Sequence, residues 1–186
     1  IERMDRVKEK IFSYFQENSQ QIEQLIIDLL SEMVKHRTVN VAEDKLADHP
    51  YLKIRGEEYR VGDIVKREFD QWKIPYQVHA RHPQRPNIIG TLGRNENGKR
   101  LLVAGHMDIV PAGPESDWAN GNPYQPVLKD GMLYGRGVLD NKGPLVSSMV
   151  GAKVLKEVVG DQALAGQLQI AALADEEAKG SDGDYG

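Results

Sequence analysis

Apolar residues recur at helical spacing in four parts of the chain. The pattern predicts an amphipathic helix over 19–35, a shorter helix before it, a third helix between 56 and 75, and a fourth over 142–159. Residues 37–55 show no clear period and are expected to form a loop. The apolar positions of the four helices, in chain order, are Val7, Ile11, Phe12 and Phe15; Ile22, Leu25, Ile26, Leu29, Leu30 and Met33; Val61, Val65, Phe69 and Trp72; and Leu145, Met149, Ala152, Leu155 and Val159.

Strand patterns lie between the third and fourth helices and after the fourth. Strands are predicted over 76–80, 87–92, 101–104 and 168–173, and the unbroken apolar run over 101–104 predicts a strand buried on both faces. The Asp130-Gly131 pair is a hairpin turn signal between two short apolar segments. Helices that alternate with buried strands indicate an α/β fold, and the early hairpin-like strands favour a mixed sheet. Ligand sites in such sheets form beyond the carboxyl ends of strands.

Composition narrows the classes of function. The chain has 186 residues, a net charge of -4 and no cysteine. The mild negative charge argues against a nucleic-acid binder, and the lack of cysteine leaves His, Asp and Glu as metal ligands. The N-terminal segment is charged and no apolar run is long enough to span a bilayer, so a cytoplasmic protein with no membrane partner is expected.

The first chemical cluster is His106-Met107-Asp108, which follows the predicted strand 101–104. Residues i and i+2 of an extended segment point to the same side, so His106 and Asp108 are expected to lie close together. A histidine that binds metal needs its second ring nitrogen held by a carboxylate or carbonyl, which Asp108 could supply. A purely structural His–Asp pair is the alternative.

The second cluster is the glycine-rich segment 135–143, in which Asp140 stands just before the fourth predicted helix. Nucleotide-binding spacings fail here, because Asp140 occupies a position that would have to be glycine and Gly143 follows Lys142. An N-cap role for Asp140 is one interpretation. A carboxylate that bridges two metal ions is the other, since a tight glycine-built loop leaves it approachable from both sides.

The third cluster, Asp175-Glu176-Glu177, follows the predicted strand 168–173. A surface acidic run would explain such a triplet. At a strand end, however, one carboxylate can bind metal while its neighbour acts as a general base toward water. The three clusters together supply nitrogen and oxygen ligands suited to zinc or a similar divalent ion.

With these motifs in order over 101–183, the chain resembles the co-catalytic zinc aminoacylase and carboxypeptidase family, which includes acetylornithine deacetylase, succinyl-diaminopimelate desuccinylase, glutamate carboxypeptidases and bacterial dipeptidases. The resemblance implies a three-layer α/β/α catalytic domain with a mixed sheet. One departure is that Ala178-Lys179 separate the Glu-Glu pair from Gly180-Ser181. The matching segments are 105–111, Trp118, Pro123-Tyr124, 130–137, 140–143 and 175–177.

The resemblance also implies a role for each residue. His106 and Glu177 would each bind one of two metal ions, which Asp140 would bridge. The ions would be zinc, with cobalt and manganese as alternatives. Glu176 would be the general base toward a metal-bridging water, and Asp108 would stand beside the site. The reaction would be hydrolysis of an amide bond in a small N-acyl amino acid or a short peptide, by a deacylase, desuccinylase or dipeptidase.

The same resemblance predicts that residues 1–186 are the N-terminal part of a catalytic domain. The family supplies a further carboxylate, a late histidine and a smaller cap domain that mediates dimerisation. No histidine stands among the nine residues after Glu177, and the cap domain is expected to lie outside this chain. Asp182 and Asp184 could be ligands, but in a Ser-Asp-Gly-Asp turn they are expected to be loop residues. A fragment of this kind should bind metal weakly and hydrolyse little, whereas the full-length protein should be a homodimer.

Two other functions stay open: a non-catalytic relative that serves as a binding or assembly module, and metal-dependent chemistry other than amide hydrolysis. The intact Glu176-Glu177 pair counts against the first. Outside the three clusters, the remaining histidines are expected to be surface or loop residues, Trp118 and Tyr124 to pack a loop, and Arg136 to pair with a structural carboxylate more readily than with a substrate. Those histidines are His36, His49, His79 and His82.

Overall fold

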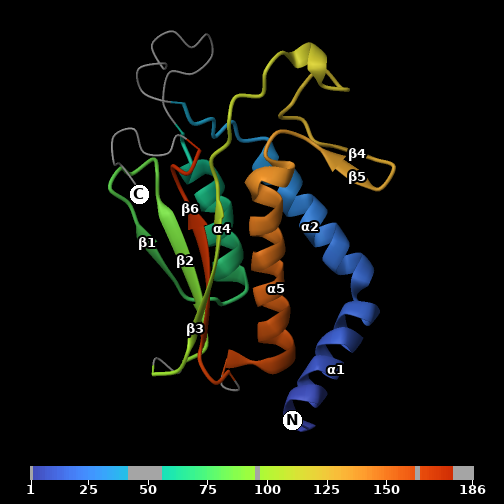
Figure 1. Ribbon diagram of the computed structural model, residues 1–186, viewed down its shortest axis with the longest axis vertical. Helices are drawn as coiled ribbons and strands as arrows, with labels where there is room; N and C mark the ends of the chain where they lie inside the picture. Colours follow the sequence, from blue (N-terminus) through green and yellow to red (C-terminus); the bar gives the residue numbers. More distant parts are fainter. Residues whose placement is uncertain (1, 42–55, 95–96, 162–163, 178–186) are drawn as a thin grey trace.

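The computed structural model describes residues 2–41, 56–94, 97–161 and 164–177. One four-stranded mixed sheet, a separate hairpin and four long helices make up this part of the chain (Figure 1). The helices are α1 (Glu2–Glu17), α2 (Ser19–Val34), α4 (Tyr59–Gln71) and α5 (Gly143–Val159). The strands are β1 (Tyr76–His79), β2 (Asn87–Leu92), β3 (Arg100–His106), β4 (Val127–Lys129), β5 (Met132–Tyr134) and β6 (Gln167–Leu173). Short helical turns occupy Glu115–Asp117 and Val138–Lys142.

The sheet has the order β1-β2-β6-β3. Strands β1 and β2 are antiparallel, as are β2 and β6, whereas β3 and β6 run parallel and in register from Arg100↔Gln167 to His106↔Leu173. The α/β class and the mixed sheet are therefore confirmed. Since β3 and β6 run the same way, their carboxyl ends meet at one edge, where the chemical clusters of the sequence were expected.

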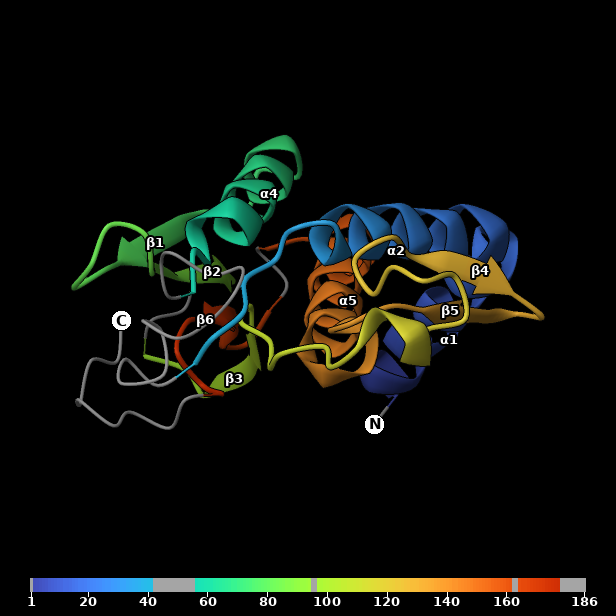
Figure 2. The same ribbon diagram turned by 90° about the horizontal axis from the view of Figure 1, so that it is seen from above.

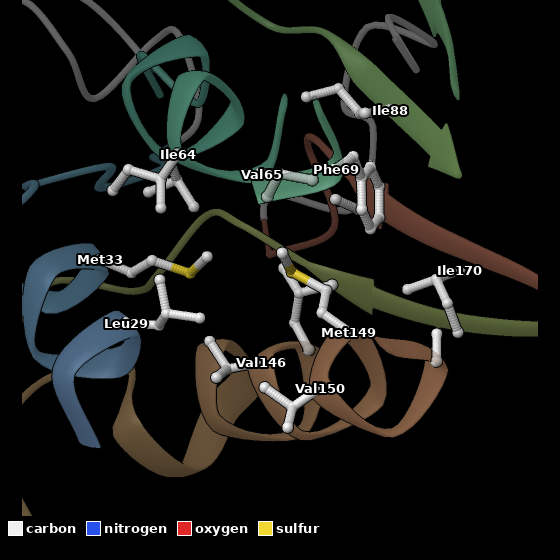
Figure 3. Packing of buried hydrophobic residues seen from close by; sticks show 14 of the residues in the cluster. Leu29, Met33, Ile64, Val65, Phe69, Ile88, Val146, Met149, Val150 and Ile170 are labelled. Carbon is white, nitrogen blue, oxygen red and sulfur yellow. The ribbon is translucent and has the colours of Figure 1, made fainter. Parts of the chain in front are cut away.

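Helices α4 and α5 cover one face of the sheet, and α2 packs beside α5 (Figure 2). Within the described ranges, no helix lies against the other face. Apolar side chains of α2, α4 and α5 point toward one another and toward Ile88 of β2 and Ile170 of β6 (Figure 3). Met33, Val65, Phe69 and Met149 are fully buried there. All the periodic positions predicted in α2 and α4, and Leu145, Met149 and Ala152 of α5, lie in or against this core. The predicted stripe of α1 does not, since Phe12 is 69% exposed and Phe15 is 38% exposed. No described helix meets the length and apolarity needed to cross a membrane.

The expectation that the strand over 101–104 is buried on both faces is wrong. Leu101 is 63% exposed and Leu102 is 55% exposed, and successive strand residues point to opposite faces. The reason is position in the sheet, because β3 is one of its two edge strands and pairs with β6 alone in the described chain. The first helix is also longer than predicted, with 16 residues, the same as α2.

Gly90 of β2 provides a test of this packing. An ideal Cβ at Gly90 would lie 2.7 Å from the Phe69 ring, a distance that real Cβ atoms do not show. We expect Gly90→Ala to lower the free energy of unfolding by about 1–3 kcal/mol, because the buried ring has no room to move aside. Urea denaturation measures this. Gly151→Ala is the control, since an added Cβ there meets nothing within 4 Å. Equal stability of Gly90→Ala and wild type would contradict the packing.

Candidate metal centre

The ends of β3 and β6 place two of the three predicted clusters side by side. His106 is the last residue of β3 and lies opposite Leu173, the last residue of β6. The pairing continues one residue further, where the Met107 N–H donates to the Leu173 carbonyl oxygen at 2.8 Å. Asp175, Glu176 and Glu177 therefore leave the sheet beside His106. One detail of the sequence analysis is corrected, since His106 belongs to the strand rather than following it.

His106 lies at the centre of the site. Its Nε2 atom is 3.0 Å from Asp140 Oδ1 and 3.7 Å from Glu176 Oε2. His106, Glu176 and Glu177 each offer one possible ligand atom, and these three atoms lie within 4.8 Å of one another. Hence the structure brings together four of the residues that the sequence singled out, from three separate segments of the chain.

The other side of the His106 ring faces Asp108. His106 Nδ1 is 3.0 Å from the Asp108 carbonyl oxygen and 3.4 Å from carboxylate Oδ1. Asp108 is fully buried, and its Oδ2 accepts hydrogen bonds from Asn40 Nδ2 at 2.7 Å and from the Glu177 N–H at 2.9 Å. Contacts of this kind fix the orientation of a ligating imidazole, so the pairing of His106 with Asp108 has the geometry that the sequence predicted.

Asp140 lies beside His106, but it does not occupy the N-cap position that was one of its two interpretations. It is not the N-cap of α5, because a short helical turn, Val138–Lys142, extends the helix backward and places Lys142 at that position. Gly137, with φ +88°, starts this turn. Asp140 itself departs from helical geometry, with φ -127° and ψ 100°. Its side chain is thus left to approach His106.

Lys142 is a fully buried side chain that the sequence analysis did not single out. Its Nζ donates hydrogen bonds to the carbonyl oxygens of Met33 at 2.9 Å and His36 at 3.0 Å, at the carboxyl end of α2. Burial lowers the pKa of Lys142 to about 7, although Asp108 and Glu58 oppose this. Lys142 therefore ties the turn that carries Asp140 to α2. Its partners lie more than 100 residues away, so no local pattern reveals the contact.

Several residues weighed in the sequence analysis lie away from this cluster or outside the described ranges. His79 and His82 are exposed on β1 and the turn after it, and His36 is half-buried. Arg136 stacks on the Trp118 ring, with its guanidinium carbon 5.3 Å from the ring centre. Trp118 in turn donates from Nε1 to the Ala112 carbonyl at 3.0 Å, so it packs its own loop. The positions outside the described residues are His49, Asp182 and Asp184.

The charges around His106 fit a bound cation. Burial lowers the pKa of His106, but the contacts with Asp108 and the charge of Glu176 outweigh it and raise the pKa to about 9. Burial also raises the pKa of Glu177; the charge of His106 opposes this, and the nearby carboxylates of Asp140, Asp108 and Glu176 add to the rise. Carboxylates gathered around one imidazole repel one another, and a divalent ion would relieve that repulsion. The nitrogen and oxygen donors suit zinc.

Metal binding at this site should release protons. A ligating imidazole must be neutral, whereas a pKa of about 9 leaves His106 protonated at pH 7. We therefore expect Zn²⁺ binding at pH 7 to release about one proton from His106, and the apparent affinity to rise about tenfold per pH unit up to about pH 9. Calorimetric titration in buffers of different ionisation enthalpy measures the protons released. Release close to zero at pH 7 would contradict this account of His106.

Residues 102–185 match the model of Peptidase family M20/M25/M40. This segment contains all five predicted site residues: His106, Asp108, Asp140, Glu176 and Glu177. The family resemblance stated on the sequence motifs is confirmed by this match.

Solved structures of peptidases share the fold. Human carnosine dipeptidase 1 is 23% identical with a TM-score of 0.69, and the alignment covers 93% of this chain and 36% of that one. The dipeptidase Dug1p of Saccharomyces cerevisiae is 21% identical with a TM-score of 0.64, covering 91% and 35%. Bacillus subtilis YXEP, described as a dinuclear metal-binding peptidase, is 14% identical with a TM-score of 0.52, covering 85% and 37%. The chain thus spans about a third of the length of these proteins.

Proposed function

We propose, from the match of residues 102–185 to a peptidase family, that the protein is a metal-dependent hydrolase of amide bonds in small N-acyl amino acids or short peptides. The observation that carries the proposal is the convergence on His106 Nε2 of carboxylates from two other segments, Asp140 at 3.0 Å and Glu176 at 3.7 Å. An imidazole surrounded by carboxylates at the carboxyl end of a sheet has the donor set of a hydrolytic metal centre.

In the proposed site, His106 and Glu177 would each hold one of two divalent ions, and Asp140 would contribute its carboxylate to both. Zinc is the first candidate, with cobalt or manganese as alternatives. Divalent ions supply Lewis acidity and lower the pKa of bound water. Asp108 keeps the His106 ring in one orientation through Nδ1.

Glu176 is the proposed general base. Its side chain is 51% exposed, so water and substrate can reach it, whereas Glu177 is the more buried of the pair. Glu176 takes a proton from the attacking water and gives it to the nitrogen of the leaving amine, so one carboxylate serves both halves of the reaction. The predicted homodimer, the cytoplasmic location and the assignment of residues 1–186 to the N-terminal part of a catalytic domain stay predictions.

The test is a screen of the full-length protein against N-acyl amino acids and dipeptides, with release of free amine as the readout. We expect hydrolysis of at least one substrate class with added Zn²⁺, Co²⁺ or Mn²⁺, its loss after chelation, and its return when the metal is restored. Hydrolysis that persists after complete removal of metal would contradict the proposal, as would inactivity on both substrate classes with metal bound.

A further inference from the structure

A buried cluster of three charged side chains, called the ion cluster below, lies next to the candidate metal centre. It consists of Glu58, just before α4; Arg85, just before β2; and Asp175, just after β6. Arg85 Nη2 donates to Glu58 Oε1 at 2.7 Å and to Asp175 Oδ1 at 2.9 Å, and Arg85 Nε donates to Glu58 Oε2 at 3.1 Å. The Arg85 side chain is 10% exposed, and those of its two partners are fully buried. One guanidinium therefore joins two carboxylates from distant parts of the chain.

Asp175 is held through its backbone as well as its side chain. Its N–H donates to Glu58 Oε1 at 3.1 Å. Its φ is +61°, in the left-handed region that residues other than glycine seldom adopt, and such a conformation persists only where the surroundings fix it. Glu176 follows directly, so the direction in which the Glu176 side chain leaves the chain depends on this conformation.

Asn40 connects the ion cluster to the metal-facing side. Its Nδ2 donates to Asp175 Oδ1 at 2.9 Å and to Asp108 Oδ2 at 2.7 Å. The same Asp108 oxygen accepts the Glu177 N–H at 2.9 Å. A continuous set of hydrogen bonds thus runs from Arg85 through Asp175 and Asn40 to Asp108, and it fixes the turn 175–177 at both of its ends.

The Glu58–Arg85 pair has little freedom of its own. An ideal Cβ at Gly56 would lie 2.3 Å from Glu58 Oε2 and 2.8 Å from Arg85 Nε, so the backbone of Gly56 packs directly on the pair. Gly56 has φ +79°, and its N–H donates to the Val39 carbonyl at 3.1 Å, next to Asn40. The Glu58–Arg85 pair is therefore confined between the Gly56 backbone on one side and the turn 175–177 on the other.

We propose that Arg85, held by Glu58, is a positioning residue of the candidate metal centre, which fixes the turn 175–177 and so the directions of the Glu176 and Glu177 carboxylates. This inference rests on the proposed function, because the Glu176 and Glu177 carboxylates need fixed directions only if they serve a metal centre. Sequence reasoning had no signal for it, because Arg85 and Asp175 are 90 residues apart and Arg85 matches no motif.

The test compares the 186-residue chain with Arg85→Gln, Arg85→Lys and a control, Arg67→Gln. The Arg67 guanidinium donates two hydrogen bonds of 2.8 Å to the Glu32 carboxylate and so joins α4 to α2. The control therefore removes an Arg–Glu pair of the same chemistry at a different place. One readout is the hydrogen-exchange rate of the Asp175 and Glu177 amides by NMR, with Ala171 in the middle of β6 as the reference. The second is Co²⁺ affinity, followed by the visible absorption of the bound ion.

We expect Arg85→Gln to accelerate exchange at Asp175 and Glu177 by at least about tenfold relative to Ala171, and to weaken Co²⁺ binding by about 10- to 100-fold. Arg67→Gln should change neither. Unchanged exchange at Glu177 in folded Arg85→Gln protein would overturn the proposal. Equal acceleration at Ala171 would also overturn it, because that result indicates a general loss of stability.

Arg85→Lys keeps the charge without the planar fork, so it decides the question if Arg85→Gln does not fold. We expect the same changes in the same direction, and wild-type exchange together with wild-type affinity would overturn the proposal. If neither the wild-type chain nor the full-length protein binds Co²⁺, the proposed metal centre is contradicted. The exchange rates at Asp175 and Glu177 then decide the positioning on their own.

Discussion

Replacement of Glu176 by glutamine in the full-length protein should lower kcat by about 10²- to 10⁴-fold while the bound metal stays at the wild-type level. Glutamine keeps the size and polarity of the side chain but cannot accept the proton that the proposed reaction transfers. The half-exposed Glu176 side chain adds little to the core, so folding should be unaffected. Steady-state kinetics on the substrate class found in the screen, with metal content measured by elemental analysis, provides the data.

Glu177→Gln is the matched control, since it makes the same change at the neighbouring residue. We expect that variant to lose metal together with turnover, because Glu177 is the proposed ligand. Unchanged kcat in Glu176→Gln would contradict the base assignment and would favour the non-catalytic binding module. Loss of metal from Glu176→Gln but not from Glu177→Gln would reverse the two roles.

Replacement of His106 by alanine should weaken divalent metal binding by more than about 100-fold. Loss of a hydrogen-bond partner of a ligand alone costs 10- to 100-fold in metal proteins, and His106 is the only imidazole among the described groups that converge on the site. Calorimetric titration with Zn²⁺ measures the change.

His79→Ala is the control for His106→Ala, because His79 is exposed on β1 and has no metal-binding partner among the groups around His106. It should bind Zn²⁺ as the wild type does. The account would be contradicted by wild-type Zn²⁺ affinity in folded His106→Ala, or by an equal loss in His79→Ala.

Local patterns were sufficient for most of the secondary structure. The stripe that predicted a helix over 19–35 corresponds to α2, Ser19–Val34, because its apolar positions are those that face the core. The hairpin signal is also confirmed, since Asp130 and Gly131 both have positive φ, at 52° and 75°. In each case the physical cause, a core-facing stripe or a turn that needs left-handed backbone, acts within a few residues.

Where the sequence failed, the cause was not local. The apolar run over 101–104 could not show that β3 is an outer strand, because sheet order depends on partners far along the chain. Asp140 had the position of a helix cap, and only the backward extension from Gly137 shows that it does not act as one.

The residues of the candidate site also fall into two groups, those that local sequence patterns identify and those that they do not. His106, Asp108, Glu176 and Glu177 were identifiable because β3 and β6 run parallel and deliver them to one edge. Asn40 and Arg85 carry no motif, and their partners around the site stand 68 and 90 residues or more away. Such supporting contacts depend on the complete fold, which periodicity does not describe.

The most direct test of the central claim is a crystal structure of the chain grown with Zn²⁺, with anomalous diffraction recorded at the zinc absorption edge. The account predicts an anomalous peak within about 2.0–2.2 Å of both His106 Nε2 and a carboxylate oxygen of Asp140. Zinc bound only at the exposed His79 and His82, or a zinc-loaded crystal with no peak beside His106, would contradict it.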